Sequence, residues 1–163
     1  MKKLLFMVCA CMMAVSLQTS CNHKKHSALM ETNIHFVPED GRLKPSSGEP
    51  YYTLVYEGYD GEELFNALSK TIAKVCTPDN SDVRTLLQRS MTITAISEPV
   101  TNENGMTFTF PYKLCFLCDD GKIQVYSPEY ELQSYRGEEY HKAAAAYLNV
   151  TITLIIKNME SNM

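Results

Sequence analysis

The sequence has no tryptophan and no excess of positive charge, and both absences narrow its possible functions. Fifteen Lys and Arg residues against 19 Asp and Glu give 163 residues a net charge of −4. A chain with this balance lacks the basic surface that binding to a nucleic-acid backbone requires. Sugar-binding sites often stack a sugar ring on tryptophan, so the absence of this residue counts mildly against carbohydrate binding.

Motifs of the common catalytic classes are missing as well. The chain has no G-x-S-x-G, H-E-x-x-H, P-loop or dinucleotide-binding fingerprint. Glu138-x-x-His141 has the spacing of half a di-iron carboxylate motif, but that chemistry requires a second copy and further glutamates. The acid pairs Glu62-Glu63 and Asp119-Asp120 are explained by a helix cap and a turn. We therefore expect no cofactor and no metal.

The longest apolar run lies at the N-terminus and predicts export. Lys2 and Lys3 precede fourteen almost unbroken apolar residues, Leu4 to Leu17, fewer than the roughly 20 of a membrane-spanning helix. With small residues behind this run, residues 1–20 have the pattern of a secretory signal peptide. Cys21 then follows the cleavage site, as in a bacterial lipoprotein precursor whose cysteine is acylated.

Cys21 is a better candidate for lipidation than Cys11. The apolar run before Cys11, Leu4 to Val8, is shorter than the ~7–15 residues of a signal core. Gln18 stands three residues before Cys21, where such signals usually have Leu. We expect a lipid anchor in a bacterial cell envelope, with the outer membrane as its site. The alternative is ordinary secretion with Cys21 as a bystander.

Three cysteines, Cys76, Cys115 and Cys118, remain after this processing. Cys115 and Cys118 form a C-x-x-C within a strand-like run, where residues three apart point to opposite faces of a sheet. The pair is therefore expected to pack apart, and neither to bond nor to share a metal. A disulfide from Cys76 to either one stays open.

The rest of the chain is long enough for one domain. Its 163 residues with 45% hydrophobic content are typical of a single foldable unit. Behind the signal we expect a lipid-anchored tether and loosely ordered approach (21–50), one domain (51–158) and a tail (159–163). Within the approach, only Ile34 to Val37 has the pattern of a short strand.

The first half of the domain alternates between strand and helix patterns. Tyr51 to Tyr56 is aromatic and β-branched, which predicts a strand. Asp60 and Glu63 have the spacing of a capping box, and the apolar residues behind them predict a helix. Residues 82–88 are ambiguous and fit one helical turn, whereas Met91 to Ile96 predicts a second strand.

The clearest pattern is a long alternation that ends in a tight turn. From Met106 to Cys118, apolar residues fill every second position, which predicts a strand buried on one face, with Pro111 at a bulge or edge. Asp120-Gly121 predicts a hairpin turn, and the return strand runs from Lys122 to about Leu132. After Gly137 the spacing predicts a second long helix, whose β-branched C-terminal half is left open.

This order of elements, behind a lipoprotein signal, resembles a family of secreted bacterial lipoproteins. The resemblance includes the start of the first helix, where residues 56–65 are Tyr-Glu-Gly-Tyr-Asp-Gly-Glu-Glu-Leu-Phe. That family is an uncharacterised domain described as having a TATA-binding-protein-like fold. The resemblance covers roughly residues 50–158. It implies an α+β fold in β-α-β-β-β-α order, with an antiparallel sheet of about four strands and two helices packed on one face. It implies no established activity.

If both helices pack on one face, the other face of the hairpin is a candidate interface. The Asp120-Gly121 turn would place Cys115 opposite Tyr126, with Leu117 beside them. An exposed apolar cluster on an otherwise polar face marks an interaction surface. The alternative is that the tether or a long loop covers this cluster.

Two functions from different classes are compatible with these observations. The first is a non-catalytic envelope module that binds a protein or peptide, or a second copy of itself, through the open sheet face. The second is a small hydrolase or metal-dependent enzyme whose site is assembled from scattered residues. The missing motifs favour the first. Membrane contact is expected through the N-terminal lipid, and nucleic acid is not expected as a partner.

Overall fold

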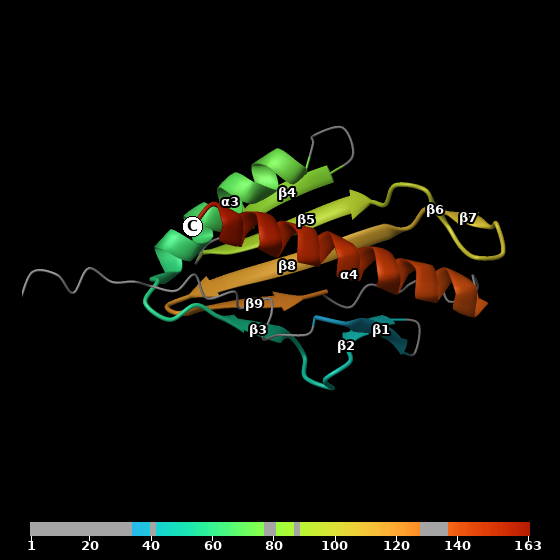
Figure 1. The fold of residues 1–163 in the computed structure, drawn as a ribbon, viewed down its shortest axis with the longest axis horizontal. Coiled ribbons are helices and arrows are strands. Elements are labelled where there is room, and N and C mark those ends of the chain that lie inside the picture. Colours follow the sequence, from blue (N-terminus) through green and yellow to red (C-terminus); the bar gives the residue numbers. More distant parts are fainter. Residues whose placement is uncertain (1–33, 40–41, 77–80, 87–88, 128–136) are drawn as a thin grey trace, which may run out of the picture.

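The computed structural model describes residues 34–39, 42–76, 81–86, 89–127 and 137–163. Within these ranges the chain forms two helices and nine strands, whose arrangement is drawn in Figure 1. In chain order these are β1 (Phe36–Glu39), β2 (Arg42–Pro45), β3 (Tyr52–Val55), α3 (Gly61–Val75), β4 (Ser81–Leu86), β5 (Ser90–Ile96), β6 (Val100–Thr101), β7 (Thr107–Phe108), β8 (Pro111–Asp119), β9 (Lys122–Tyr126) and α4 (Gly137–Ser161).

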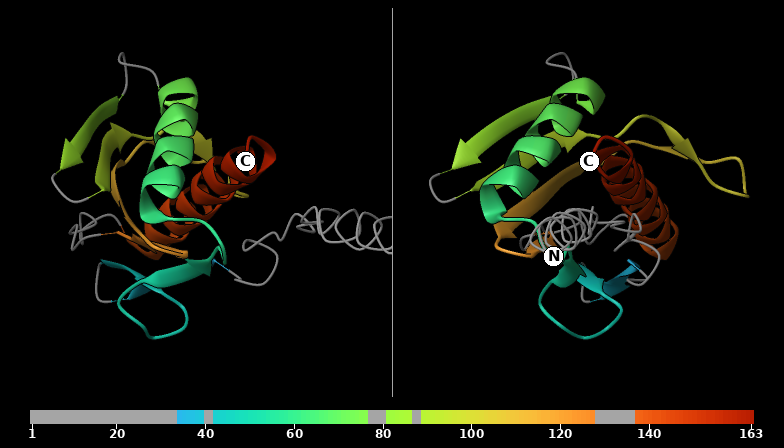
Figure 2. Two further views of the ribbon diagram at one scale, coloured as in Figure 1. Left: turned by 90° about the vertical axis from the view of Figure 1, so that its left-hand side faces the viewer. Right: turned by 60° about the vertical axis from the view of Figure 1, so that its left-hand side comes forward.

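One antiparallel sheet forms the centre of the molecule. Its five strands lie in the order β3-β9-β8-β5-β4, and every pair of neighbours is antiparallel. Both helices lie on the same face of this sheet, as Figure 2 shows. The expected α+β arrangement with two helices on one face is confirmed.

The sheet has one strand more than the sequence patterns suggest. Ser81–Leu86 forms the edge strand β4, whereas residues 82–88 fit one helical turn in the sequence. Val83 and Thr85 are β-branched at alternate positions, and they stand opposite Ile93 and Met91 of β5. Pairing with a neighbouring strand therefore outweighs a weak local preference.

The core lies between the sheet and the helices. Alternate residues of β8, from Tyr112 to Cys118, point into it and are buried. They meet the apolar stripe of α3 (Leu64, Leu68 and Ile72) and that of α4 (Leu148, Ile152, Ile155, Ile156 and Met159). α4 continues through its β-branched segment, because the buried isoleucines pack against this core.

The long alternating strand is interrupted before Pro111. Proline has no N–H for the ladder, and β8 begins at this residue. Ser97 supports the break, because its Oγ accepts the Phe110 N–H at 3.0 Å and its own N–H bonds the Phe110 carbonyl at 2.8 Å. Phe110 forms a second cluster with Tyr140 and Ala144 of α4. Phe108 packs edge-on against Tyr140, with ring centroids 5.8 Å apart.

The turn between β8 and β9 is held against the start of α3. Asp60 and Glu63 form the expected capping box. The Asp120 carboxylate accepts the Gly61 N–H at 2.9 Å and an Arg89 N–H at 3.1 Å. These two hydrogen bonds lower the pKa of Asp120 below its ordinary value, and the bond from Gly61 has the larger effect. A Cβ at Gly61 would lie 2.5 Å from Arg89 Nη1 and 3.0 Å from the Asp119 carbonyl carbon, so Arg89 and the turn would have to shift to admit any other residue here.

A hairpin upstream of the sheet belongs to the same packed body. Phe36 of β1 is fully buried in the core, and its backbone is held by Asn149 of α4, whose Oδ1 accepts the Phe36 N–H at 2.7 Å. The Tyr52 hydroxyl of β3 bonds the backbone of His35 and of Ser46. This hairpin lies in the stretch expected to be a loosely ordered approach, so packing begins before residue 51.

Two sequence expectations lie outside the described residues. The signal peptide and Cys21 fall within residues 1–33, and the far end of the expected return strand falls within 128–136. In the described ranges, neither helix combines the length and the apolar character required to cross a bilayer.

Candidate interface on the open sheet face

The face of the sheet opposite the helices carries the second set of alternate residues. On β8 these are Lys113, Cys115 and Leu117, because their neighbours Leu114, Phe116 and Cys118 point into the core. The strand register extends this face through Gln124 and Tyr126 of β9 and through Ser90, Thr92 and Thr94 of β5. We call it the open face. Neither helix covers it (Figure 2).

Three residues form a row across the middle of the open face. Cys115 stands opposite Tyr126 on one side, as the Asp120-Gly121 turn predicts, and opposite Thr92 on the other. The Thr92 hydroxyl and the Cys115 sulfur lie 3.3 Å apart. Burial, followed by the neighbouring Cys115, raises the pKa of the Tyr126 phenol. Tyr126 and Cys115 are therefore close neighbours on this face, as the strand register places them.

Leu117 lies two positions from Cys115 on the same strand, between Gln124 and Ser90. Leu117 and Tyr126 are half-buried, whereas Cys115 is only 7% exposed. The sequence places all three in an exposed cluster. In the structure Cys115 is almost fully buried, whereas Leu117 and Tyr126 are partly exposed and accessible to a partner. We call Cys115, Leu117 and Tyr126 the central cluster.

Exposed apolar side chains also flank the central cluster. Ile96, at the end of β5, is 62% exposed, and Val55, at the end of β3, is 45% exposed. Both belong to the open face, because Ala95 and Leu54 beside them point into the core. Between them lie threonines, Gln124 and Lys113. The open face thus combines apolar groups with hydrogen-bonding ones, which is the composition of many protein interfaces.

The C-x-x-C pair behaves as its strand position predicts. Cys118 is buried in the core on the helix side, whereas Cys115 lies on the open face. Burial, with the nearby Asp119 adding to it, raises the pKa of Cys118 to about 12. Burial also raises the pKa of Cys76. All three are free thiols, and two with raised pKa values are poor nucleophiles at neutral pH.

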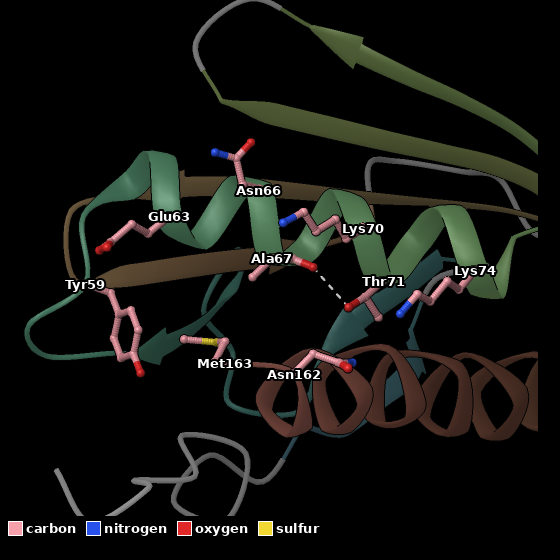
Figure 3. Close-up of a pocket in the computed structure, with 9 residues that line it drawn as sticks. All are labelled: Tyr59, Glu63, Asn66, Ala67, Lys70, Thr71, Lys74, Asn162 and Met163. Atoms are coloured by element: carbon pink, nitrogen blue, oxygen red, sulfur yellow. Dashed lines mark hydrogen bonds between the residues drawn. The ribbon is translucent and has the colours of Figure 1, made fainter. Parts of the chain in front are cut away.

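A groove of 480 Å³ lies on the helix side, between α3 and the end of α4. Figure 3 shows Glu63, Lys70 and Lys74 of α3 along one wall and Asn162 and Met163 along the other. The Glu63 carboxylate already accepts the Asp60 N–H at 3.1 Å as part of the helix cap. No ion pair to a described carboxylate is found for either lysine. The side chains that line the groove thus carry two positive charges and one negative charge, and the negative one, Glu63, already has a structural role.

The part of the chain that the structure describes contains no cluster of side chains suited to binding a metal ion. There, no three His, Cys, Asp or Glu side chains come close enough to share an ion. The Nε2 atom of His141 is buried and has no hydrogen-bond partner among the described residues. Its sequence neighbour in the Glu-x-x-His spacing, Glu138, instead pairs with Lys142 at 2.7 Å.

Thr92 contacts the central cluster, but the sequence did not single it out. In the sequence it is one polar position in an alternating strand. Its contact with Cys115 depends on the pairing of β5 with β8. That pairing spans 23 residues of sequence, and no turn motif fixes its register as Asp120-Gly121 does for β8 and β9.

Comparison with known proteins shows the fold. No protein-family description and no curated protein matches the chain. Among solved structures it is similar to a TBP-like protein from Parabacteroides distasonis ATCC 8503, with a TM-score of 0.53 and 14% sequence identity. The match covers 76% of this chain and 96% of that one. The chain therefore has the TBP-like fold that the sequence resemblance implies, and a fold alone assigns no activity.

If the Tyr126 ring covers the Cys115 sulfur, replacing it with Ala should expose the thiol. A buried thiol reacts only through local opening, so we expect Tyr126→Ala to speed alkylation of Cys115 by about tenfold or more. Peptide mass spectrometry after brief treatment with iodoacetamide measures this rate. Cys118 on the opposite face is the internal control and should stay slow. Equal acceleration at both cysteines would mean general unfolding, and no change at Cys115 would show that Tyr126 does not cover it.

Proposed function

We propose that this protein is a non-catalytic binding or assembly module of the bacterial cell envelope. It is anchored by lipid at Cys21 and holds a protein partner against the open face. The observation that carries the proposal is the placement of Leu117 and Tyr126, half-buried at the centre of a sheet face without helices.

The residues of the central cluster are of the kinds that contribute most to binding at the centre of protein interfaces. Tyrosine brings a large ring and a hydroxyl group with little conformational entropy to lose, and it is enriched where interfaces are strongest. Leu117 lies beside it, and Gln124 and Ser90 stand opposite Leu117 on the neighbouring strands. Gln124 can bond a partner's backbone, while the apolar pair is removed from water. Burial of a leucine side chain contributes roughly 1.5–3 kcal/mol.

The packing around Cys115 also supports this function. Cys115 and Thr92 are buried and bonded to each other, so the sheet beneath Tyr126 is already packed. A partner would meet a preorganised surface and would have little to order on binding. Cys115 and Cys118 are buried free thiols, and burial raises the pKa of Cys118 and of the partly buried Cys76, which fits packing better than covalent catalysis.

The proposed anchor fits the start of the packed body. Ile34, the first described residue, already lies in the core, and residues 22–33 separate it from Cys21 in the sequence. At ~3.3–3.6 Å per residue, twelve residues reach at most roughly 40 Å when fully extended. The domain would then remain close to the membrane surface, where a neighbouring envelope protein can be met. Two or three acyl chains would hold the anchor stably, since a single chain binds only marginally.

Removal of the lipidated residue should change where the protein is found. We expect Cys21→Ala to appear in the soluble fraction or to accumulate with its signal uncleaved, because no thiol is available for acylation. Fractionation and the mass of the product measure both outcomes. Cys11→Ala is the matched control and should be processed and anchored normally. A Cys21→Ala protein that stays membrane-bound and normally processed would contradict the anchor.

Charges placed on the central cluster should abolish binding. We expect the Leu117→Glu, Tyr126→Glu double variant to lose the associations of the wild-type protein, because two carboxylates would be desolvated in the interface. The measurement is chemical cross-linking in intact envelopes followed by comparison of the cross-linked species.

The matched control changes apolar residues on the helix side. Val150 and Leu154 on the outer surface of α4 are 59% and 50% exposed, so Val150→Glu, Leu154→Glu should keep every association. Circular dichroism and gel filtration verify that each variant is folded and monodisperse. A folded Leu117→Glu, Tyr126→Glu protein with all wild-type associations would exclude the open face as the interface.

A further inference from the structure

The groove between α3 and the end of α4 has different chemistry at its two ends. Figure 3 shows Tyr59 and Met163 toward the start of α3, and Lys74 toward the end of that helix. An aromatic ring and a thioether thus line one end, and an ammonium group lines the other. With a volume of 480 Å³, the groove lies within the roughly 300–1,000 Å³ range of small-molecule sites.

The positive charges of the groove lie together on α3. Lys70 and Lys74 are one helical turn apart and therefore project from the same side of the helix. Glu63, which carries the carboxylate side chain of the groove, stands in the first turn of α3, roughly 16 Å before Lys74 along the helix axis. Its carboxylate accepts the Asp60 N–H at 3.1 Å. The helix cap therefore holds the negative charge away from the lysine end.

The opposite wall supplies a neutral hydrogen-bond donor. Asn162 donates one amide hydrogen to the Asn158 carbonyl at 2.5 Å, so its second amide hydrogen can bond a ligand. The buried Thr71 hydroxyl is already used, because it donates to the Ala67 carbonyl at 3.0 Å, as the dashed line in Figure 3 shows. The donors that the groove offers a ligand are thus ammonium groups and an amide, which suit an anion.

We propose that this groove binds a small phosphate monoester that carries an apolar group. Such a phosphate has a charge of about −1.5 to −2 at neutral pH, which the ammonium groups of Lys70 and Lys74 balance together. Its apolar group packs against Tyr59 and Met163 at the other end. One exposed lysine alone would contribute little, because water screens its charge. The proposal goes beyond the proposed function, because it uses the helix side and leaves the central cluster free.

Methionine methyl groups report binding at the groove itself. The experiment uses the full chain labelled with ¹³C at the methionine methyls and carrying Cys21→Ala, so that no attached lipid competes for the groove. Titration with phenyl phosphate, followed by nuclear magnetic resonance, should shift the Met163 signal in a saturable manner, and Met163→Leu assigns that signal. Met106 is the internal control and should not shift, because it is 45% exposed but lies beside β7, at the other end of the molecule (Figure 1).

Two pairs of lysines separate the site from general attraction between charges. Lys70→Gln, Lys74→Gln should weaken binding of phenyl phosphate by about tenfold or more, because charge-assisted bonds to the phosphate are lost. Lys142→Gln, Lys157→Gln is the matched control, since it removes the same charge from α4 outside the groove. Circular dichroism verifies that each variant is folded.

The two halves of the probe are tested separately. Phenol, which lacks the phosphate, should shift the Met163 signal only at concentrations about tenfold higher or more. The proposal is overturned if phenyl phosphate leaves Met163 unshifted or shifts Met106 equally. It is also overturned if phenol binds as tightly as phenyl phosphate, or if the folded Lys70→Gln, Lys74→Gln protein binds no more weakly than the Lys142→Gln, Lys157→Gln control.

Discussion

The structure depends on β8, which supplies side chains to the core on one face of the sheet and to the open face on the other. Side chains along a strand point alternately to opposite sides, and β8 has a strand on each side, β5 and β9. Tyr112, Leu114, Phe116 and Cys118 are removed from water by α3 and α4. The residues between them are displayed on the face that neither helix reaches. Cys115 and Leu117 occupy the open face because their neighbours are required in the core.

A local arrangement keeps this alternation in register. Asp120 links the β8–β9 turn to the first N–H of α3 and to Arg89 before β5. A shift of one residue would break these bonds and would exchange the two faces of β8. The same turn therefore determines that Tyr126, and not a neighbour, lies against Cys115. The helix start, the hairpin and the central cluster depend on one another, although they lie far apart in sequence.

The sequence predicts those parts of the fold that local chemistry determines. Asp60 and Glu63 identify the start of α3, Asp120-Gly121 identifies the hairpin, and alternation along β8 separates Cys115 from Cys118. Parts determined by distant partners could not be predicted. β4 is a strand because β5 lies beside it, and the burial of Phe36 depends on Asn149, 113 residues away. For the candidate site, the register between Cys115 and Tyr126 was predictable, whereas Thr92 and the burial of Cys115 were not.

Our central proposal is that a protein partner in the envelope contacts the open face at the central cluster. Its most direct test places the photo-cross-linking residue p-benzoylphenylalanine at position 117 of the full chain in living cells, with position 154 on α4 as the control. We predict a discrete adduct from position 117 that is lost with Tyr126→Glu and is absent from position 154. No adduct from position 117, or the same adduct from both positions, would contradict it.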